Sequence, residues 1–325
     1  MHPPIPGLVS TIIPVHNRPA LLPEAVGSVL AQTYRPLEII IVDDGSTDHT
    51  LDITHQLATQ NPREIQVLTQ PNAGPGLARE TGRQQARGEF IQYLDSDDLL
   101  LPRKFEWQVA GLRQHVECGV AYGKTAFQSS SGPADNLPWK RTGEAIAQMF
   151  PSFLSSRWWG TSTPLYRRAI CDAAGPWLAL LNEEDWEYDC RIASQGVQLC
   201  FIDEFVSLER DHTGPRLSRG GSVERKKLRD RAKAQALILQ HARRAGIGES
   251  RPEMQQFARA LFLLARQCGA AGLGEESRML FRLAQDASGE KRARSLDFQL
   301  YDWAARVLGW QLAGKIACTA DRLRP

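Results

Sequence analysis

The first 100 residues alternate between short apolar runs and segments with helical spacing. Four runs rich in β-branched residues predict buried strands, at residues 8–15, 37–42, 65–69 and 90–94. Between them, apolar side chains recur every three or four residues, which predicts helices at 21–32, 47–60 and 76–86. Strands that alternate with helices in this way form a doubly wound parallel sheet. We therefore predict an α/β fold with helices on both faces of the sheet.

The pattern is less regular after residue 100. Helical spacing covers residues 102–119, a Ser, Gly and Pro-rich stretch over 128–143 predicts an irregular loop, and residues 199–206 predict another strand. Strand signals then end, and three or four helices are expected at about 223–245, 252–271, 274–287 and 295–320. We predict an α/β domain over residues 1–215 and a helical C-terminal extension over residues 216–325.

The composition is typical of a soluble globular protein, with 42% hydrophobic and 23% charged residues. The net charge of +2 conceals an asymmetry, because residues 1–209 carry 16 Lys and Arg against 25 Asp and Glu, whereas residues 210–325 carry 23 against 12. The acidic part is suited to gathering metal cations. The basic part suits an anionic partner such as a diphosphate, a lipid headgroup or a nucleic acid, or it consists of solvated helix faces.

The six cysteines include no Cys-x-x-Cys pair and none at zinc-finger spacing from a histidine, which predicts reduced thiols. The N-terminus lacks the basic start and long apolar run of a signal peptide. No stretch approaches 18 uninterrupted apolar residues. We therefore expect a cytoplasmic protein, with any membrane contact peripheral and on the inner face of the cell membrane.

An acidic cluster follows the strand predicted at residues 90–94. Asp95 and Asp97 alternate along the chain and so point to the same side. Carboxylates this close repel one another unless a cation lies between them, and Mg²⁺ or Mn²⁺ binds one or two carboxylates together with phosphate oxygens. The alternative is that Asp98 is the N-cap of the following helix.

A second acidic cluster, Asp43 and Asp44, follows the strand predicted at 37–42. Gly45 permits a tight turn, and Ser46 or Thr47 is expected to cap the next helix. Capping does not explain Asp44, because it has no basic neighbour in the sequence. Its carboxylate is suited to accept hydrogen bonds from a nucleobase N–H or a ribose hydroxyl.

Six segments, in this order and spacing, resemble the inverting family 2 glycosyltransferases. They are Ile-Pro-Val-His-Asn-Arg at 13–18, Val-Asp-Asp-Gly-Ser-Thr-Asp at 42–48, Asn-Ala-Gly at 72–74, Ala-Arg-Glu-Thr-Gly at 78–82, Gly-Glu-Phe-Ile at 88–91 and Leu-Asp-Ser-Asp-Asp at 94–98. The resemblance extends over roughly residues 8–215. It implies a GT-A fold, a nucleotide-diphosphate sugar as donor and a divalent metal, Mn²⁺ or Mg²⁺.

The resemblance also implies roles for individual residues. Those that would bind the donor are Pro14, His16 and Arg18 at the nucleotide, Asp44 at the base, Arg79 at the base or phosphates, Asp95 at the ribose or the metal, and Ser96. Asp97 would bind the metal directly, with Asp95 as a further ligand. His212, which keeps the spacing of the family's Arg-x-His segment with Arg210, would bind the metal or the diphosphate. Arg216 and Arg219 would close over the leaving diphosphate.

The segment Asn-Glu-Glu-Asp-Trp-Glu-Tyr at 182–188 resembles the family's Glu-Asp motif. Its catalytic base would correspond to Asp185, with Glu184 as a close rival. Inversion needs a carboxylate that takes the proton from the acceptor hydroxyl as this attacks the anomeric carbon. The alternative is that these acids favour the positive end of a helix dipole.

We therefore expect an inverting glycosyltransferase with a saccharide or lipid-linked hydroxyl acceptor, in bacterial surface polysaccharide or glycolipid synthesis, and no nucleic-acid partner. A metal-dependent nucleotidyltransferase is one alternative, but it would carry a Gly-rich basic loop where residues 16–20 are His-Asn-Arg-Pro-Ala. A non-catalytic subunit that binds nucleotide-sugars is the other. The presence of Asp44, Asp97 and Asp185 argues against it.

The C-terminal segment predicts an amphipathic helix. Its apolar residues are Leu300, Trp303, Val307, Trp310 and Gly314, spaced to lie on one face, with Arg306, Lys315, Arg322 and Arg324 around it. Trp with Lys and Arg on such a helix is typical of contact with an anionic membrane surface. The alternative is that both Trp side chains pack onto the protein.

Overall fold

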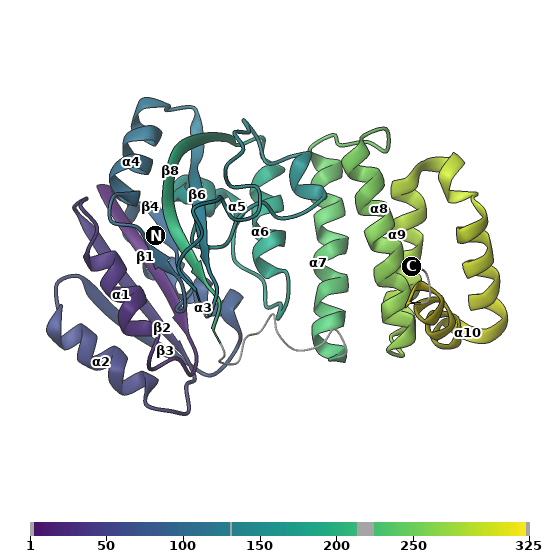
Figure 1. The fold of residues 1–325 in the computed structure, drawn as a ribbon, viewed down its shortest axis with the longest axis horizontal. Coiled ribbons are helices and arrows are strands. Elements are labelled where there is room, and N and C mark those ends of the chain that lie inside the picture. The colour runs from purple at the N-terminus through teal and green to yellow at the C-terminus, as the bar shows by residue number, and fades with distance from the viewer. Residues whose placement is uncertain (1–2, 131, 213–223, 323–325) are drawn as a thin grey trace. The chain divides into compact units, whose positions relative to one another are not determined.

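The computed structural model describes residues 3–130, 132–212 and 224–322, and the chain divides into two compact units (Figure 1). The first unit comprises Met1–Gln148, Trp158–Ala179 and Gly196–Gly214, and the second comprises Met149–Arg157, Leu180–Gln195 and Pro215–Pro325. The division into domains at residue 215 stays a prediction. Arg216 and Arg219, expected at the diphosphate, lie outside the described residues.

The first unit contains an eight-stranded sheet in the order β3-β2-β1-β4-β7-β6-β8-β5. Its first half is made of the four strands that the apolar runs predicted, β1 (Ile5–Val15), β2 (Leu37–Asp44), β3 (Ile65–Gln70) and β4 (Gly88–Tyr93). All three pairings among them are parallel. The predicted α/β alternation is therefore confirmed for this half.

The other half of the sheet is mixed rather than parallel. It contains β5 (Leu99–Leu100), β6 (Cys118–Gln128), β7 (Leu165–Arg167) and β8 (Gln198–Arg210). Strand β7 runs antiparallel to both β4 and β6, whereas β6 and β8 are parallel. The sequence pattern predicted only β8. It missed β6 because Gly119, Gly123 and Lys124 interrupt the apolar run, and it missed β5 and β7 because two or three residues carry no periodicity.

Helices cover both faces of this sheet. On one face α1 (Leu22–Leu30), α2 (Thr50–Gln60) and α4 (Lys104–Gln114) pack against alternate strand residues in the main apolar core, including Val9, Ile13, Ile39 and Ile41. Each such side chain stabilises the fold by about 1.5–3 kcal/mol when buried. The other face carries α3 (Pro75–Gln85) and α5 (Arg168–Ala174).

Gly82 explains how closely α3 approaches the sheet. A Cβ at Gly82 would lie 2.5 Å from Cγ2 of Ile12 in β1. Real Cβ atoms do not tolerate that distance, so any larger residue would push the helix away from the strand. The close contact fixes α3 against β1 and β2, where Val42 is the next neighbour of Gly82.

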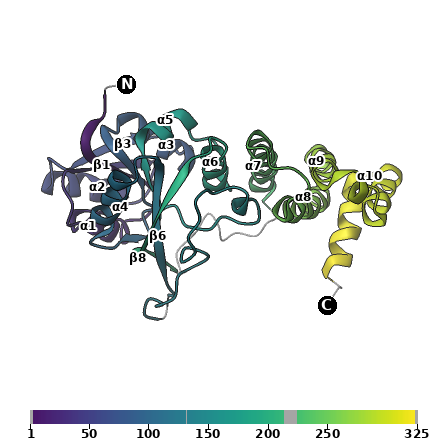
Figure 2. The ribbon, with the colours of Figure 1, turned by 90° about the horizontal axis from the view of Figure 1, so that it is seen from above.

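The second unit is helical. It contains the short 3₁₀ helix Ser152–Leu154, α6 (Glu184–Ala193), α7 (Arg225–Arg244), α8 (Pro252–Ala270), α9 (Gly274–Ala293) and α10 (Leu296–Arg322). Both views show α7 to α10 following one another in chain order (Figures 1 and 2). The prediction of three or four helices in the C-terminal part is thus confirmed, with α7 to α10 among the described residues. Over the described ranges, no helix has the length and apolar character needed to cross a membrane.

The predicted single apolar face of the last helix is wrong, because the helix is kinked at Gly309, where φ is 80°. After the kink, the Trp310 ring packs 5.6 Å from Phe281 of α9, and a Cβ at Gly314 would lie 2.4 Å from the backbone nitrogen of Ala270. Before the kink, by contrast, Trp303 is 62% exposed. Arg324 and the side chain of Arg322 lie outside the described part.

Candidate active site

The carboxyl ends of five strands meet at one edge of the sheet. Strands β1, β2 and β4 are parallel neighbours, and the two antiparallel pairings of β7 make β6 and β8 parallel to them as well. The polar segments 16–18, 43–48 and 95–98 therefore share an edge with the chain that leaves β6 at Gln128 and β8 at Arg210. Ligands of open α/β sheets bind at such an edge.

Asp97 and His212 come together at this edge, although 115 residues separate them in the chain. The Nε2 atom of His212 lies 2.8 Å from Oδ2 of Asp97, and both side chains are partly exposed. Arg210, two residues before His212, donates from Nε to the backbone oxygen of Asp97 at 2.7 Å. The end of β8 is thereby attached to the acidic loop after β4.

Asp98 takes part in this attachment. The alternative explanation, that Asp98 is the N-cap of the following helix, is therefore wrong. Its carboxylate accepts hydrogen bonds from Oγ of Ser162 at 2.7 Å and from the backbone N–H of Arg210 at 3.2 Å. Helix α4 begins six residues later, at Lys104. Burial, followed by the negative charges of Glu209, Asp97 and Asp95, raises the pKa of Asp98 well above its usual value.

Asp95 is bound to the protein's own arginine. Nη2 of Arg79, in α3, lies 2.7 Å from Oδ1 of Asp95, and the guanidinium also lies over the ring of Trp177, 4.9 Å from its centroid. Arg79 is buried, and so is Ser96 beside Asp95. A charge-assisted bond in such a setting orients both partners. Asp95 is thus directed to Arg79, whereas Asp97 is directed to His212.

Asp44 is buried and accepts three hydrogen bonds from the segment that leads into α3. The donors are Nε2 of Gln70 at 2.7 Å and the backbone N–H groups of Ala73 and Gly74, each at 2.8 Å. Gly74 has a φ of 90°, which a residue other than glycine could adopt here only with strain. Asp44 therefore has a structural function that the sequence did not suggest. Its contact with a nucleobase stays a prediction.

The turn after β2 is built differently from the prediction. Helix α2 begins only at Thr50, whose N–H binds Oδ1 of Asp48, so Ser46 and Thr47 do not cap it. They bind Asn17 instead: Oγ of Ser46 accepts from the Asn17 backbone N–H at 3.0 Å, and the Thr47 N–H donates to Oδ1 of Asn17 at 2.8 Å. Both therefore join the ends of β1 and β2. The tight turn expected at Gly45 is present, with a φ of 68°.

The three residues expected at the nucleotide all lie at the end of β1. Pro14 pairs with Val42 of β2 and lies beyond the last residue of β1 that is paired with β4. Because β4 is not paired at this position, the missing N–H of proline costs no hydrogen bond to β4. Nδ1 of His16 lies 2.9 Å from the backbone oxygen of Asp44. The backbone N–H of Arg18 binds Oγ1 of Thr50 at 2.8 Å.

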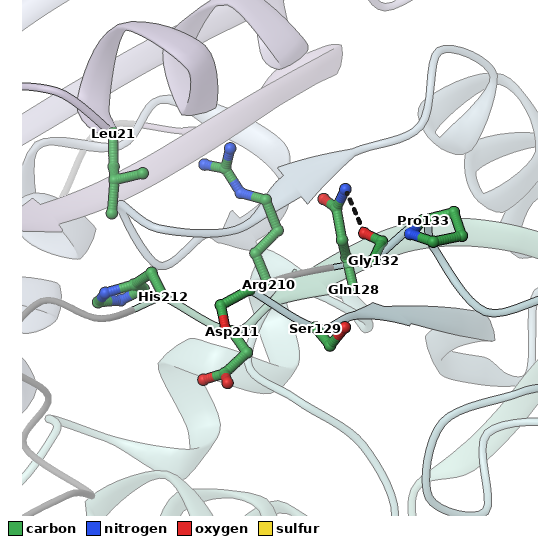
Figure 3. Close-up of a pocket in the computed structure, with 9 residues that line it drawn as sticks. Leu21, Gln128, Ser129, Gly132, Pro133, Arg210, Asp211 and His212 are labelled. Atoms are coloured by element: carbon green, nitrogen blue, oxygen red, sulfur yellow. Dashed lines mark hydrogen bonds between the residues drawn. The ribbon is translucent and has the colours of Figure 1, made fainter.

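A cavity of about 580 Å³ opens beside His212 (Figure 3). The residues that line it come from the position before α1, the end of β6 with the loop after it, and the end of β8. They are Leu21, Gln128, Ser129, Ser130, Gly132, Pro133, Arg210, Asp211 and His212. This volume lies in the range of small-molecule sites. Sequence reasoning missed Gln128 and Ser129 because it did not predict β6, which positions them.

The residues at this edge fit a cation that is shared with a bound diphosphate. Among the described residues, no group of three or more His, Cys, Asp or Glu is suited to a metal. Asp97 and His212 supply one carboxylate and one imidazole. Mn²⁺ accepts this combination and completes its coordination with phosphate oxygens and water.

Asp185 lies in the second unit, in the first turn of α6. Its Oδ2 is 2.5 Å from Nη1 of Arg157, and its Oδ1 accepts from the backbone N–H of Trp186 at 2.7 Å. Arg157 also binds the buried Asp189, one helical turn further on, at 2.7 Å. The rival Glu184 is buried in the same turn. The structure thus gives Asp185 a fixed orientation and partial exposure.

The flanking acids of this segment join α6 to α7. Glu183 accepts hydrogen bonds from Arg231 at 2.7 Å and from Gln235, and burial raises its pKa. Glu187 binds Arg191 and His241 of α7. Burial alone would raise the pKa of Glu187, but the hydrogen bonds from His241 and Arg191 hold it below its usual value. A favourable helix dipole therefore does not account for the whole cluster.

Comparisons with known proteins bear on the family of this domain and on its fold. Residues 10–170 match the family model described as Glycosyl transferase family 2. An uncharacterized glycosyltransferase of Nostoc sp. is 39% identical over 134 residues, which are 38% of this chain and 42% of the relative. One of Haemophilus influenzae is 35% identical over 125 residues, or 38% of this chain and 50% of the relative. The chain spans about half the length of these curated relatives.

Two solved proteins share the fold. S. aureus TarS 1–349 has a TM-score of 0.66 at 19% identity, covering 98% of this chain and 93% of that one. Its complex with UDP-GlcNAc has a TM-score of 0.61 at 18% identity, with coverages of 86% and 88%. Mannosyltransferase PcManGT from Pyrobaculum calidifontis, in complex with GDP-Man and Mn²⁺, has a TM-score of 0.50 at 19% identity, with coverages of 97% and 87%.

These likenesses, at under 25% identity, concern the fold alone, and they confirm the predicted GT-A α/β fold. The family match adds the identity of the domain that contains β1, β2, β4 and the acidic loops after them. The chain therefore carries a glycosyl transferase family 2 domain at residues 10–170.

Proposed function

We propose that the chain is an inverting glycosyltransferase that moves a sugar from a nucleotide-diphosphate sugar to a hydroxyl acceptor. The observation that carries this proposal is the Asp97–His212 pair, 2.8 Å apart, at the sheet edge of a family 2 domain. A carboxylate and an imidazole brought together from distant parts of the chain form a site for a diphosphate-bound cation. A fold alone would not require such a pair.

The donor would bind along the carboxyl ends of β1, β2 and β4. The residues assigned to it are Pro14, His16, Arg18, Asp44, Arg79, Asp95 and Ser96, with Asp97 and His212 at the cation. TarS binds UDP-GlcNAc and PcManGT binds GDP-Man with Mn²⁺, which supports a nucleotide-sugar and Mn²⁺ or Mg²⁺ here. When bound, the cation supplies positive charge that stabilises the diphosphate as it leaves. Arg216 and Arg219 would add to that charge.

Asp185 would act as the general base, with Glu184 as the alternative. Its carboxylate takes the proton of the acceptor hydroxyl while that oxygen bonds to the anomeric carbon. The bond from this carbon to the diphosphate oxygen breaks on the opposite face, so the anomeric configuration inverts. Arg157 holds the carboxylate in one orientation through its bond to Oδ2.

The acceptor would be a saccharide or a lipid-linked glycan of bacterial surface polysaccharide or glycolipid synthesis. A lipid-linked acceptor lies at the inner face of the cell membrane, where a cytoplasmic enzyme would meet it by peripheral contact. The exposed apolar residues of α10 before its kink support such contact.

The test is donor hydrolysis and binding with single variants. The wild-type protein with UDP-sugars, GDP-sugars or dTDP-sugars should release the nucleoside diphosphate only when Mn²⁺ or Mg²⁺ is present. Asp97→Ala should abolish this release. Asp52→Ala, which removes an exposed carboxylate that is paired with His49, is the matched control and should behave as wild type. Equal release by wild type and Asp97→Ala would overturn the proposal.

The products distinguish the two other functions. A nucleotidyltransferase would form pyrophosphate and a nucleotide-sugar from a sugar phosphate and a nucleoside triphosphate. A non-catalytic subunit would bind the nucleotide-sugar and melt at a higher temperature, because ligand at 100 times the Kd adds about 2.7 kcal/mol to the free energy of unfolding. It would release no product.

A further inference from the structure

The helical unit contains a cavity of its own, between α9 and α10, with a volume of about 540 Å³. Its lining includes Arg278 and Arg282 on α9, and Arg306 and Trp310 on α10. The cavity lies where α10 bends at Gly309, which also lines it. Its volume is that of a site for a small organic molecule and exceeds what a bare inorganic ion needs.

The charge around this cavity is unbalanced. Asp302 is the one carboxylate in its lining, and it is bound to Arg306 at 2.6 Å. Arg278 and Arg282 are four residues apart, so their positive charges face the same side of α9. Within the described ranges neither of them has an ion-pair or hydrogen-bond partner. Two guanidinium groups that repel one another at a cavity suit a ligand with two negative charges, and a phosphate group matches their geometry.

The floor of the cavity is aromatic. Phe281 is buried, the Trp310 ring lies 5.6 Å from it, and the guanidinium of Arg278 lies 5.8 Å from the centroid of Trp310. Trp310 is only half-buried, so part of its ring faces the cavity. An aromatic face next to guanidinium groups binds the C–H groups of a sugar ring while the arginines hold an acid on that ring.

We propose that this cavity is a second ligand site, which binds a sugar phosphate. The phosphate lies between Arg278 and Arg282, and the sugar ring lies against Trp310. The site is built entirely from α9 and α10, so its existence does not depend on the transfer reaction proposed above.

Titration calorimetry with glucose 1-phosphate tests this at 150 mM salt and without divalent cations. The parallel probes are inorganic phosphate and uncharged methyl glucoside. We expect glucose 1-phosphate to bind at least tenfold more tightly than inorganic phosphate, and methyl glucoside to bind more weakly than either. Equal affinities for glucose 1-phosphate and inorganic phosphate, or no binding of glucose 1-phosphate, would overturn the proposal.

The variant Arg278→Gln with Arg282→Gln should raise the Kd for glucose 1-phosphate at least tenfold. Both side chains are exposed, so the fold should persist, which the thermal shift with UDP and Mn²⁺ checks independently. Arg259→Gln removes one exposed arginine from α8 and is the matched control, with an unchanged Kd expected. If the double variant binds glucose 1-phosphate as tightly as wild type, the site is refuted. If Arg259→Gln loses as much affinity as the double variant, the binding comes from general surface charge, and the site is refuted as well.

Discussion

Arg157 binds Asp185 across 28 residues of the chain, with 2.5 Å between Nη1 and Oδ2. The same guanidinium binds the buried Asp189 through Nε. One arginine therefore connects the segment before residue 158 to two consecutive turns of α6. Because its planar group is fixed by Asp189, it also fixes the direction of the Asp185 carboxylate. Arg157 is in this sense a positioning residue for the proposed base.

We expect Arg157→Lys to lower turnover roughly tenfold, about 1.4 kcal/mol, while the KM for the donor stays unchanged. Lysine keeps the positive charge but cannot bind both carboxylates with one rigid fork. Steady-state kinetics in the donor and in the acceptor measure this. A rise in donor KM at constant kcat would show instead that Arg157 acts on donor binding. Arg157→Gln should also destabilise the fold by about 3–5 kcal/mol, because the buried Asp189 loses its charge partner.

We expect Asp185→Asn to lower turnover by ~10²–10⁴-fold, the usual effect of removing a general base. Donor binding should persist, because the amide keeps the shape of the side chain. Glu184→Gln is the matched comparison in the same helical turn. If Glu184→Gln lost this activity and Asp185→Asn retained it, Glu184 would be the base.

We expect His212→Ala to weaken Mn²⁺-dependent UDP binding tenfold or more, on the order of 1.4 kcal/mol, because the cation loses its imidazole ligand. Binding without Mn²⁺ should change little. Calorimetric titration with and without Mn²⁺ separates the two contributions. Combining His212→Ala with Asp97→Ala should cost less than the sum of the single losses, because both residues contact one ion. Fully additive losses would mean that the two residues act independently.

The parallel half of the fold and most of its edge residues could be predicted from the sequence. Asp97, Asp44 and His16 follow apolar strands, and parallel neighbours bring such strand ends together whatever else the chain does. Partners that depend on tertiary contacts could not be predicted. Nothing local to Asp98 indicates Ser162 or Arg210, and nothing local to Glu183 indicates α7.

Local periodicity also failed where single residues redirect the backbone. The spacing of Trp303 and Trp310 places them on one face of an ideal helix, but Gly309 at φ 80° separates their directions. Ser46 and Thr47 are good capping residues by type. In the structure they bind Asn17, and the N–H of Thr50 at the start of α2 binds Asp48 instead.

Stability should fall at alkaline pH because of Tyr122. Its buried hydroxyl donates to the Glu144 backbone oxygen and accepts from the Ile146 N–H, both at 2.8 Å, and burial raises its pKa to about 12. Since the unfolded value is about 10, the folded state keeps the proton longer. This contribution of Tyr122 to the free energy of unfolding is complete below pH 10 and is lost as the pH rises towards and through 12.

Urea unfolding of wild type and Tyr122→Phe from pH 8 to 11 measures this contribution. The stability difference should shrink above pH 10, and a constant difference would contradict the assignment.

The exposed side of α10 before Gly309 predicts contact with a membrane. Leu296, Leu300, Trp303 and Val307 are 60–74% exposed at helical spacing, and they lie opposite the buried Phe298 and Tyr301. Trp with aliphatic neighbours on an outward helix face is the pattern of an interfacial segment.

We expect the protein to float with anionic vesicles at low salt, and Leu300→Ser with Trp303→Ser to abolish flotation while keeping the melting temperature. Met279→Ser removes one exposed apolar side chain from α9 and should float as wild type. Flotation that survives the double variant would exclude this face, and a wild-type protein that forms dimers but ignores vesicles would mean that a second copy covers it.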